Sequence, residues 1–282
     1  LTTNPVNVSV AHQTCPNPVN ATYPQLCASG ENGVPISIQN TAHIYGTVKA
    51  NNQVSGTGMS DPGLTASSGV SAQALPAHDR DAQQAAVATT ITGSAASCSG
   101  SQTRSWAANT KITGDVSIKN NCVVTVSGNI WITGKLEVEN SAQIIVADSL
   151  GATRPDVMVD GPIGAVFKNS AKLKSNSTGT GFRILTYYSK ASCSPECSEV
   201  TGQDLYDSRS ETTINLDNSA EGPQTIFYAR WTRVLISNSG QIGALVGQTV
   251  ELKNSGTITF GSTVGGETSR FWIIDTYRRV FD

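Results

Sequence analysis

Apolar and polar residues alternate along much of the chain, and the alternation comes in short runs. Residues 116–118 and 124–126, for example, each place an apolar side chain at every second position. A period of two is typical of β-strands that bury one face. Thr-Gly, Ser-Gly-Asn and Asn-Ser-Ala or Asn-Ser-Gly interrupt these runs, and no 3.6-residue pattern spans them. The sequence therefore predicts many short strands.

The runs belong to a repeated template, apolar-x-apolar-x-Asn-small-small-x-apolar. Residues 112–126 align without gaps on residues 132–146, an offset of 20, and residues 234–242 align on 250–258, an offset of 16. A short fixed period indicates a repeat architecture whose units bury a face only against their neighbours. We expect an all-β fold, a single-stranded parallel β-helix (β-solenoid) of roughly 16–20-residue coils. The copies begin at Ile36, Val116, Leu136, Ala165, Ile214, Val234 and Val250.

Each copy carries an asparagine at the same position, and we expect this residue to form a corner. Asn tolerates the left-handed αL conformation that a sharp turn between strands requires. Stacked copies would repeat the side-chain amide about every 4.8 Å, so that the amides could bond in an internal ladder. The expected structural corners are Asn40, Asn120, Asn140, Asn169, Asn218, Asn238 and Asn254.

Stacking in this register also brings charged residues of successive copies together. It predicts that Asp115 lies beside Lys135, and Lys119 beside Glu139. Exposed pairs of this kind contribute roughly 0.2–1 kcal/mol each. A glycoside-cleaving site needs the opposite arrangement, with two carboxylates about 5–9.5 Å apart in one groove. The regular copies therefore favour a structural role over a catalytic one.

The remaining segments suggest caps and insertions. We expect residues 1–35 to be an extended N-terminal segment stapled by a disulfide, and 36–282 to be the solenoid. A Gly- and Ser-rich stretch at 52–75 indicates a loop, and a helix-favouring stretch at 76–90 opens with Pro76 and indicates one short helix. Residues 191–212 form a long polar loop, and the apolar, aromatic residues within 266–282 suggest a C-terminal cap. Since the chain begins at Leu1, we expect a processed or shortened form of a longer protein.

Composition and cysteine content indicate an extracellular protein. Charged residues make up 14% of the chain and the net charge is −2, which gives no electrostatic case for an obligate nucleic-acid partner. The six cysteines suggest a disulfide framework in an oxidising compartment. Six cysteines allow 15 connectivities; we favour the local pairs Cys15–Cys27, Cys98–Cys122 and Cys193–Cys197. No apolar run of about 20 residues is present, so we expect no transmembrane segment in this chain.

No motif for catalysis, a cofactor or a metal is present. The chain lacks G-x-S-x-G, P-loop and Rossmann patterns, and its three histidines have no partners at ligand spacing. Two acidic pairs, Asp79 with Asp81 and Asp204 with Asp207, are better explained as solvated or ion-paired groups than as calcium or sugar ligands. The tentative contacts to a ligand or to DNA are Lys168, Lys172, Lys174, Arg230, Trp231 and Arg233. Tyr187, Tyr188, Tyr206 and Tyr228, together with Trp231, could form a glycan platform, although core or cap packing is the more common role for such residues.

Four segments together resemble a known family: N-I-W-I-T-G-K-L at 129–136, T-I-F-Y-A-R at 225–230, W-I-I-D-x-Y at 272–277, and above all the block G-x-I-G-A-x-V-G-x-x-V at 240–250. They resemble the β-solenoid domain of bacterial type IV pilus-associated proteins of the minor-pilin kind, over roughly residues 76–282. The resemblance implies a domain displayed outside the cell without catalytic residues, with pilus subunits or a surface protein or glycan as partners. The family's roles in adhesion, twitching motility and DNA uptake become expectations. The chain departs from the family in lacking the hydrophobic N-terminal pilin helix.

Four functions follow as hypotheses. The first is an extracellular, non-catalytic surface adhesin or pilus-associated protein. The alternatives are a DNA-binding minor pilin for DNA uptake, a polysaccharide-acting β-helix enzyme, and a subunit that self-assembles into homo-oligomeric filaments.

Overall fold

The computed structural model describes residues 80–188, 211–255 and 257–258, and the backbone of five further strands between residues 6 and 67. Within the long strands β20 and β21, the side chains of 230, 231, 246–250 and 252 are not described. Several expectations therefore lie outside the described residues: the cysteines Cys15, Cys27, Cys193 and Cys197, the corner Asn40, the loop at 191–210 and the cap at 266–282.

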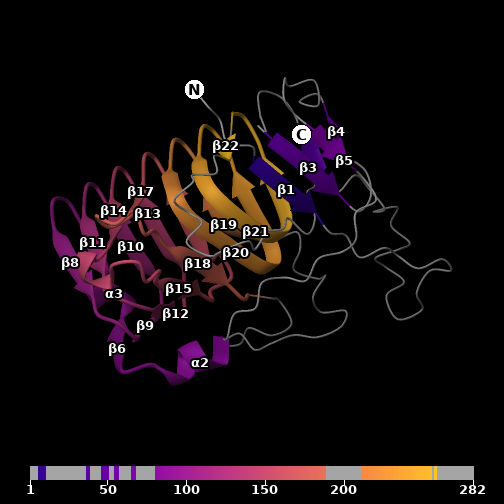
Figure 1. Cartoon of the computed structure of the whole chain (residues 1–282). Helices are drawn as coiled ribbons and strands as arrows, with labels where there is room; N and C mark the ends of the chain where they lie inside the picture. The colour runs from indigo at the N-terminus through magenta and orange to yellow at the C-terminus, as the bar shows by residue number, and fades with distance from the viewer. Residues whose placement is uncertain are drawn as a thin grey trace.

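The fold is all-β with parallel strands, as predicted, and short helices are few (Figure 1). The main sheet has 17 strands, and every registered pairing between them is parallel. The strands fall into three rows, and the chain visits the rows in a fixed order. One strand from each row, in chain order, makes up what we call a unit, and each unit stacks on the next.

Row 1 contains β7 (Cys98–Ser99), β10 (Val116–Lys119), β13 (Leu136–Glu139), β16 (Ala165–Lys168) and β19 (Thr212–Leu216). Row 2 contains β8 (Thr103–Trp106), β11 (Val123–Val126), β14 (Gln143–Val146) and β17 (Lys172–Lys174). Row 3 contains β6 (Thr89–Thr92), β9 (Thr110–Thr113), β12 (Ile130–Ile132), β15 (Asp156–Val159) and β18 (Arg183–Thr186).

Toward the C-terminus the separate strands merge. The strands β20 (Glu221–Ile236) and β21 (Gln241–Leu252) each run through all three rows, with register shifts where the shorter strands would have ended. The last described strand, β22 (Thr257–Ile258), pairs with the start of β21. Units at this end have almost no loop between their strands, which explains why the sequence offset between copies falls to 16 there.

The core lies between the three rows. In β10 the buried residues are Val116 and Ile118, while the residues between them are partly exposed, and β11 shows the same alternation. One continuous cluster of buried apolar side chains extends from Ala96 to Leu245. Within it, the rings of Phe167 and Phe227 meet edge to face with centroids 5.9 Å apart. The period of two thus marks the inward face, because each strand buries only one side.

The predicted short helix is present as α2 (Arg80–Ala85). Its Gln83 side chain donates to the carbonyl oxygen of Ile130 at 3.1 Å, which docks the helix on the outer side of row 3. A second apolar cluster lies on this side and consists of Trp131, Met158, Leu185, Tyr187 and Tyr228. The row-3 strands β12 and β15 are therefore packed on both faces, which accounts for their continuous burial.

The expectation of one helix was incomplete. A four-residue helix, α3 (Gly93–Ala96), forms the corner between β6 and β7, and a 3₁₀ turn, η2, covers Asp148–Leu150. Thr92 is the N-cap of α3, since its hydroxyl accepts from the backbone N–H of Ala95 at 3.3 Å. A hydrogen-bonded corner this short leaves no helical pattern in the sequence.

The N-terminal part contains further strands, some of them where the sequence suggested a loop. A three-stranded sheet joins β1 (Val6–Val10), β3 (Gly46–Ala50) and β5 (Thr65–Ser67), and a two-stranded sheet joins β2 (Ile36–Ile38) and β4 (Val54–Gly56). The prediction of a loop across 52–75 is therefore wrong at β4 and β5, whereas β1 lies within the segment at 1–35 that we expected to be extended. The strands β4 and β5 are only three residues long and consist mostly of small residues, so their side chains gave little signal.

Candidate functional site

The repeated Asn position of the template forms a sharp left-handed corner. Asn120 and Asn140 have φ of 54° and 56°, and the residue after each also has positive φ. The N–H of Cys122 donates to the carbonyl of Lys119 at 3.1 Å, which closes a β-turn around two positive-φ residues. The predicted αL conformation is thus confirmed for Asn120, Asn140, Asn169, Asn218, Asn238 and Asn254. The second left-handed residue, usually Ser, was not predicted.

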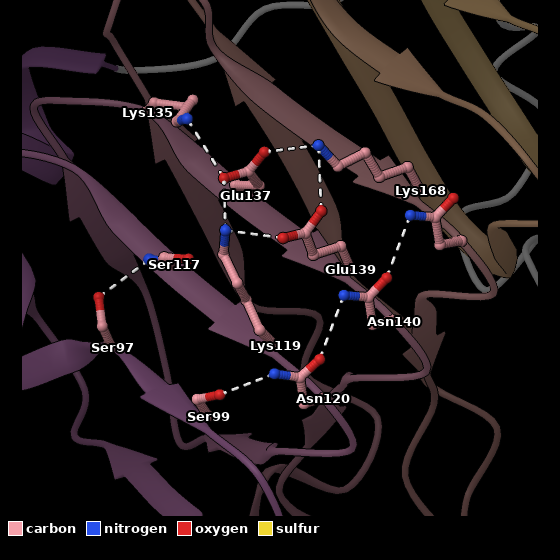
Figure 2. A network of polar contacts seen from close by, with 11 residues as sticks. Ser97, Ser99, Ser117, Lys119, Asn120, Lys135, Glu137, Glu139, Asn140 and Lys168 are labelled. Atoms are coloured by element: carbon pink, nitrogen blue, oxygen red, sulfur yellow. Dashed lines mark hydrogen bonds and ion pairs between the residues drawn. The ribbon is translucent and has the colours of Figure 1, made fainter.

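The predicted amide ladder is present. The Asn140 Nδ2 donates to the Asn120 Oδ1 at 3.2 Å, and the Nδ2 of Asn169 donates to the Asn140 Oδ1 at 3.1 Å (Figure 2). The Asn218 Nδ2 extends the row by donating to the Asn169 Oδ1, and at the other end the Asn120 Nδ2 donates to the Ser99 hydroxyl. It is exposed and not internal as expected, because the inward position at each corner belongs to the small residue two places later, such as Cys122 or Ala142.

One contact in the amide ladder differs from the others in its acceptor. The Asn238 Nδ2 donates to the Oδ1 of Asp217 at 2.7 Å instead of to Asn218. The same carboxylate oxygen also accepts from the Ser237 hydroxyl at 2.9 Å. A carboxylate next to the corner attracts the amide more strongly than a neutral carbonyl, since charge-assisted hydrogen bonds are stronger.

Beside the ladder, on the outer face of row 1, lies a network of five charges that we call the row-1 ion network (Figure 2). Glu139 lies 2.7 Å from the Lys119 ammonium and 3.0 Å from that of Lys168. Glu137 lies 2.9 Å from Lys168, 3.3 Å from Lys135 and 3.5 Å from Lys119. Two carboxylates from one strand are thus held by three lysines on three successive units.

The network confirms one predicted pair and revises the other. Lys119 and Glu139 are direct neighbours in the register of β10 and β13, as expected. Asp115 does lie beside Lys135, but its carboxylate accepts from the backbone N–H of Lys135 at 2.8 Å. The ammonium of Lys135, which directly precedes β13, lies 3.3 Å from Glu137 instead.

Mutual neutralisation shifts the protonation equilibria of the network. A hydrogen bond from Lys168, assisted by Lys135 and Lys119, lowers the pKa of Glu137 to about 2. The hydrogen bond from Lys119 lowers the pKa of Glu139. The same contacts raise the pKa of Lys119 and of Lys168. Both carboxylates therefore stay ionised at neutral pH, so neither can act as a general acid there.

The described members of the expected basic contact surface are divided between rows 1 and 2, and most of them are paired with carboxylates. Lys168 belongs to row 1 and is held by two glutamates, while Lys172 in row 2 lies 3.7 Å from Glu221. Arg233 lies 2.9 Å from the buried Glu251, and its Nε donates to the Thr212 hydroxyl at 2.7 Å. Lys174 is exposed. Arg230 and Trp231 lie in β20, and their side chains are outside the described residues.

The aromatic residues of row 3 serve packing. Tyr187 and Tyr228 are buried, with ring centroids 5.9 Å apart, so they offer no exposed platform for a glycan. Tyr188 is partly buried against the same cluster. Tyr206 lies outside the described residues.

Row 3 also holds charged groups that the sequence analysis missed. Asp160 accepts from the Trp131 indole N–H at 2.9 Å and lies 3.5 Å from the Arg80 guanidinium of α2. Asp156 and Arg183 form a bidentate pair with both contacts at 2.6 Å. Asp156 and Arg183 are register partners 27 residues apart, and only an alignment that allowed for the insertion could have paired them.

A disulfide joins Cys98 to Cys122, as predicted, with a sequence separation of 24. Cys98 lies in β7, and Cys122 is the small inward residue of the next unit's corner. The bridge therefore ties the first unit of row 1 to the second. The other two predicted bridges lie outside the described residues.

Within the described segments, no three His, Cys, Asp or Glu side chains gather in a way that could hold a metal ion. No helix in these segments is long and apolar enough to span a membrane. Comparison with protein-family models, curated proteins and solved structures finds no match to this chain.

Proposed function

We propose that this chain is a β-solenoid of the type IV pilus-associated, minor-pilin-like kind, displayed outside the cell as a non-catalytic adhesion domain. Its three rows are the faces of a single-stranded parallel β-helix, and each unit is one coil. The proposal rests on the row registers together with the sequence resemblance in residues 225–230 and 240–250.

The non-catalytic role rests mainly on one observation: the polar side chains on the outer face of row 1 bind one another. On row 1 the carboxylates of Glu137 and Glu139 are each held by at least two lysines, and the amide of Asn140 is bonded on both sides. Catalytic carboxylates need a free face toward the substrate and distinct protonation states. The polar surface of these coils is arranged to hold neighbouring coils together.

The disulfide supports the extracellular location. Structural disulfides persist in oxidising compartments and are rare in the cytosol. The bridge between Cys98 and Cys122 closes a loop at the beginning of the stack, where it stabilises the terminal coil.

The loop between β18 and β19 is the binding element that we propose. The regular coils are joined by tight corners, whereas the chain makes a polar excursion between Thr186 and Thr212 before it rejoins row 1. Loops placed on a rigid scaffold commonly carry binding function. Because Thr212 accepts a hydrogen bond from Arg233, we limit the deletion to residues 191–210, which keeps that contact.

The test is attachment of beads coated with the purified protein to abiotic surfaces, a glycan array and cultured epithelial cells. Removal of 191–210 should abolish attachment and leave the circular dichroism spectrum unchanged. A matched control, Glu221→Gln, removes from the framework a charge whose side chain is 45% exposed and should leave attachment intact. Full attachment without 191–210, or product release from a panel of polysaccharides, would contradict the proposal.

DNA binding is the alternative that the same preparation can test. Most of the described lysines of rows 1 and 2 are neutralised by glutamates, which leaves little charge to contact phosphates. We expect no gel shift of double-stranded DNA at low salt. A salt-dependent shift that Arg233→Ala reduces would favour DNA uptake over adhesion.

A further inference from the structure

Among the described strands, the first unit forms one end of the parallel sheet. The register pairs β7 with β10, β8 with β11 and β6 with β9, and none of these three strands has a second registered partner among the described strands. In Figure 1, β8 and β6 lie at the end of the stack opposite β22. Three of the four residues of β8 are exposed, whereas β11 alternates between partly and fully buried positions. Such an edge is a template on which further strands could pair.

One residue on this edge does not match its position. The register pairs Arg104 with Val124 and Val124 with Ile144, and the row continues through Leu173. Each of these later residues is a buried apolar side chain of the core. Arg104 thus holds the inward-facing position of the first unit, yet it is exposed. Its guanidinium bonds within its own strand region, to the side-chain oxygen of Gln102 and to the carbonyl of Thr103, both at 3.3 Å.

The neighbouring inward position is closed by a large ring. Trp106 pairs with Val126 in the register and is 1% exposed. Its indole N–H donates to the carbonyl of Ala96 in α3 at 3.2 Å. Trp106 therefore fills the interior of the first unit, while Arg104 lies over its open edge.

We infer that Arg104 prevents a second copy of this chain from extending the sheet at β6, β7 and β8. A copy stacked on β8 with the existing register would enclose the guanidinium between its own inward side chain and Val124. No carboxylate occupies the corresponding inward row in Ile144 or Leu173 of the later units, so a stacked copy with the same pattern would leave the charge unpaired. An unpaired buried charge strongly opposes association, and inward-pointing charges are a known means of protecting sheet edges.

The chain's own N-terminal strands agree with this inference. Strand β2 carries the same template as β10, yet its registered partner is β4, and the two N-terminal sheets are separate from the main sheet. The described main sheet thus begins at the unit that carries Arg104. The inference rests on the proposed solenoid architecture but not on adhesion, and it favours single molecules over filaments built by end-to-end stacking.

The test is the oligomeric state of the full chain, measured by sedimentation velocity across a concentration series. We expect wild type and Arg104→Glu to remain monomeric, and Arg104→Val to associate with a Kd at least roughly 100-fold lower than that of wild type, since an unpaired buried charge is removed. The matched control is Lys174→Val, which removes an exposed positive charge from an outer position of row 2 and should remain monomeric. Arg104→Thr removes the same charge with a polar, β-branched residue and serves if the valine variant does not fold.

Monomeric Arg104→Val or Arg104→Thr at the highest concentration, with a native circular dichroism spectrum, would overturn the inference. Equal association of the Lys174→Val control, or end-to-end association of wild type, would also overturn it. A failure of the adhesion proposal has a separate readout, because the attachment of coated beads is measured independently of the oligomeric state.

Discussion

Replacing Glu137 with glutamine removes the carboxylate that three lysines share and keeps the side chain's size. Contacts of 2.9, 3.3 and 3.5 Å with Lys168, Lys135 and Lys119 are weakened, and Glu139 remains as the only carboxylate of the network. We expect Glu137→Gln to destabilise the protein at neutral pH. The contacts span three successive units, so the effect reports how strongly neighbouring units hold one another.

The pKa of Glu137 gives the magnitude. It falls from the ordinary 4.5 to about 2, a difference of about 2.5 (4.5 − 2), and each pKa unit corresponds to about 1.4 kcal/mol, or about 3 kcal/mol in total. The Glu137 side chain is 14% exposed, and those of its lysine partners are 25–36% exposed. Water and salt screen such contacts, so we expect a loss of about 1–2 kcal/mol in the free energy of unfolding.

The pH dependence follows from the sign of the shift. Because the folded-state pKa lies below the unfolded one, the stabilisation is complete above pH 4.5 and disappears as the pH falls through about 2. The assay is urea denaturation of wild type and Glu137→Gln at several pH values. Glu221→Gln, which removes a 3.7 Å contact from a carboxylate that is 45% exposed, is the matched control and should change little. Equal stability of Glu137→Gln and wild type at pH 7, or a difference that persists at pH 2, would refute the reasoning.

Two further changes test the corner and the disulfide. Asn140→Ala should cost about 2–3 kcal/mol in the free energy of unfolding, because it loses two amide bonds and puts a Cβ-bearing residue without local hydrogen bonds at φ of 56°. Asn140→Gly should cost only about 1 kcal/mol, since glycine adopts this conformation without strain; equal losses in both variants by chemical denaturation would contradict the strain argument. The double variant Cys98→Ala, Cys122→Ala opens a loop with a separation of 24 residues, for which chain entropy predicts a loss of about 3 kcal/mol. An unchanged melting temperature in calorimetry would show that the first unit is held without the bridge.

The parts of the fold that could be predicted are those with strong local constraints. Asn at a left-handed corner recurs visibly because few residues accept positive φ, so the copies from Asn120 to Asn254 could be aligned. The alignment then supplied the register, and the register placed Lys119 against Glu139. All copies run in the same direction along the sequence, which predicted that their strands pair in parallel.

The other features depend on contacts that the template does not encode. Lys168 joins the row-1 ion network from a copy displaced by an insertion, and the Lys135 ammonium contacts Glu137, two residues later, and not the Asp115 carboxylate. Arg104 lies in a unit without an Asn corner, where Gly100 has the positive φ instead, so the template does not cover it. Burial of row 3 beneath α2 depends on tertiary packing, which hydrophobic alternation alone does not reveal.

The central claim is that successive copies of the template stack in one direction with their Asn amides in a row. Nuclear magnetic resonance of the ¹⁵N-labelled protein tests it directly, through NOEs between side-chain amides. The account predicts that the Asn140 amide shows NOEs both to Asn120, 20 residues earlier, and to Asn169, 29 residues later. An Asn140 amide without these two contacts, or strands paired antiparallel across the corner, would contradict it.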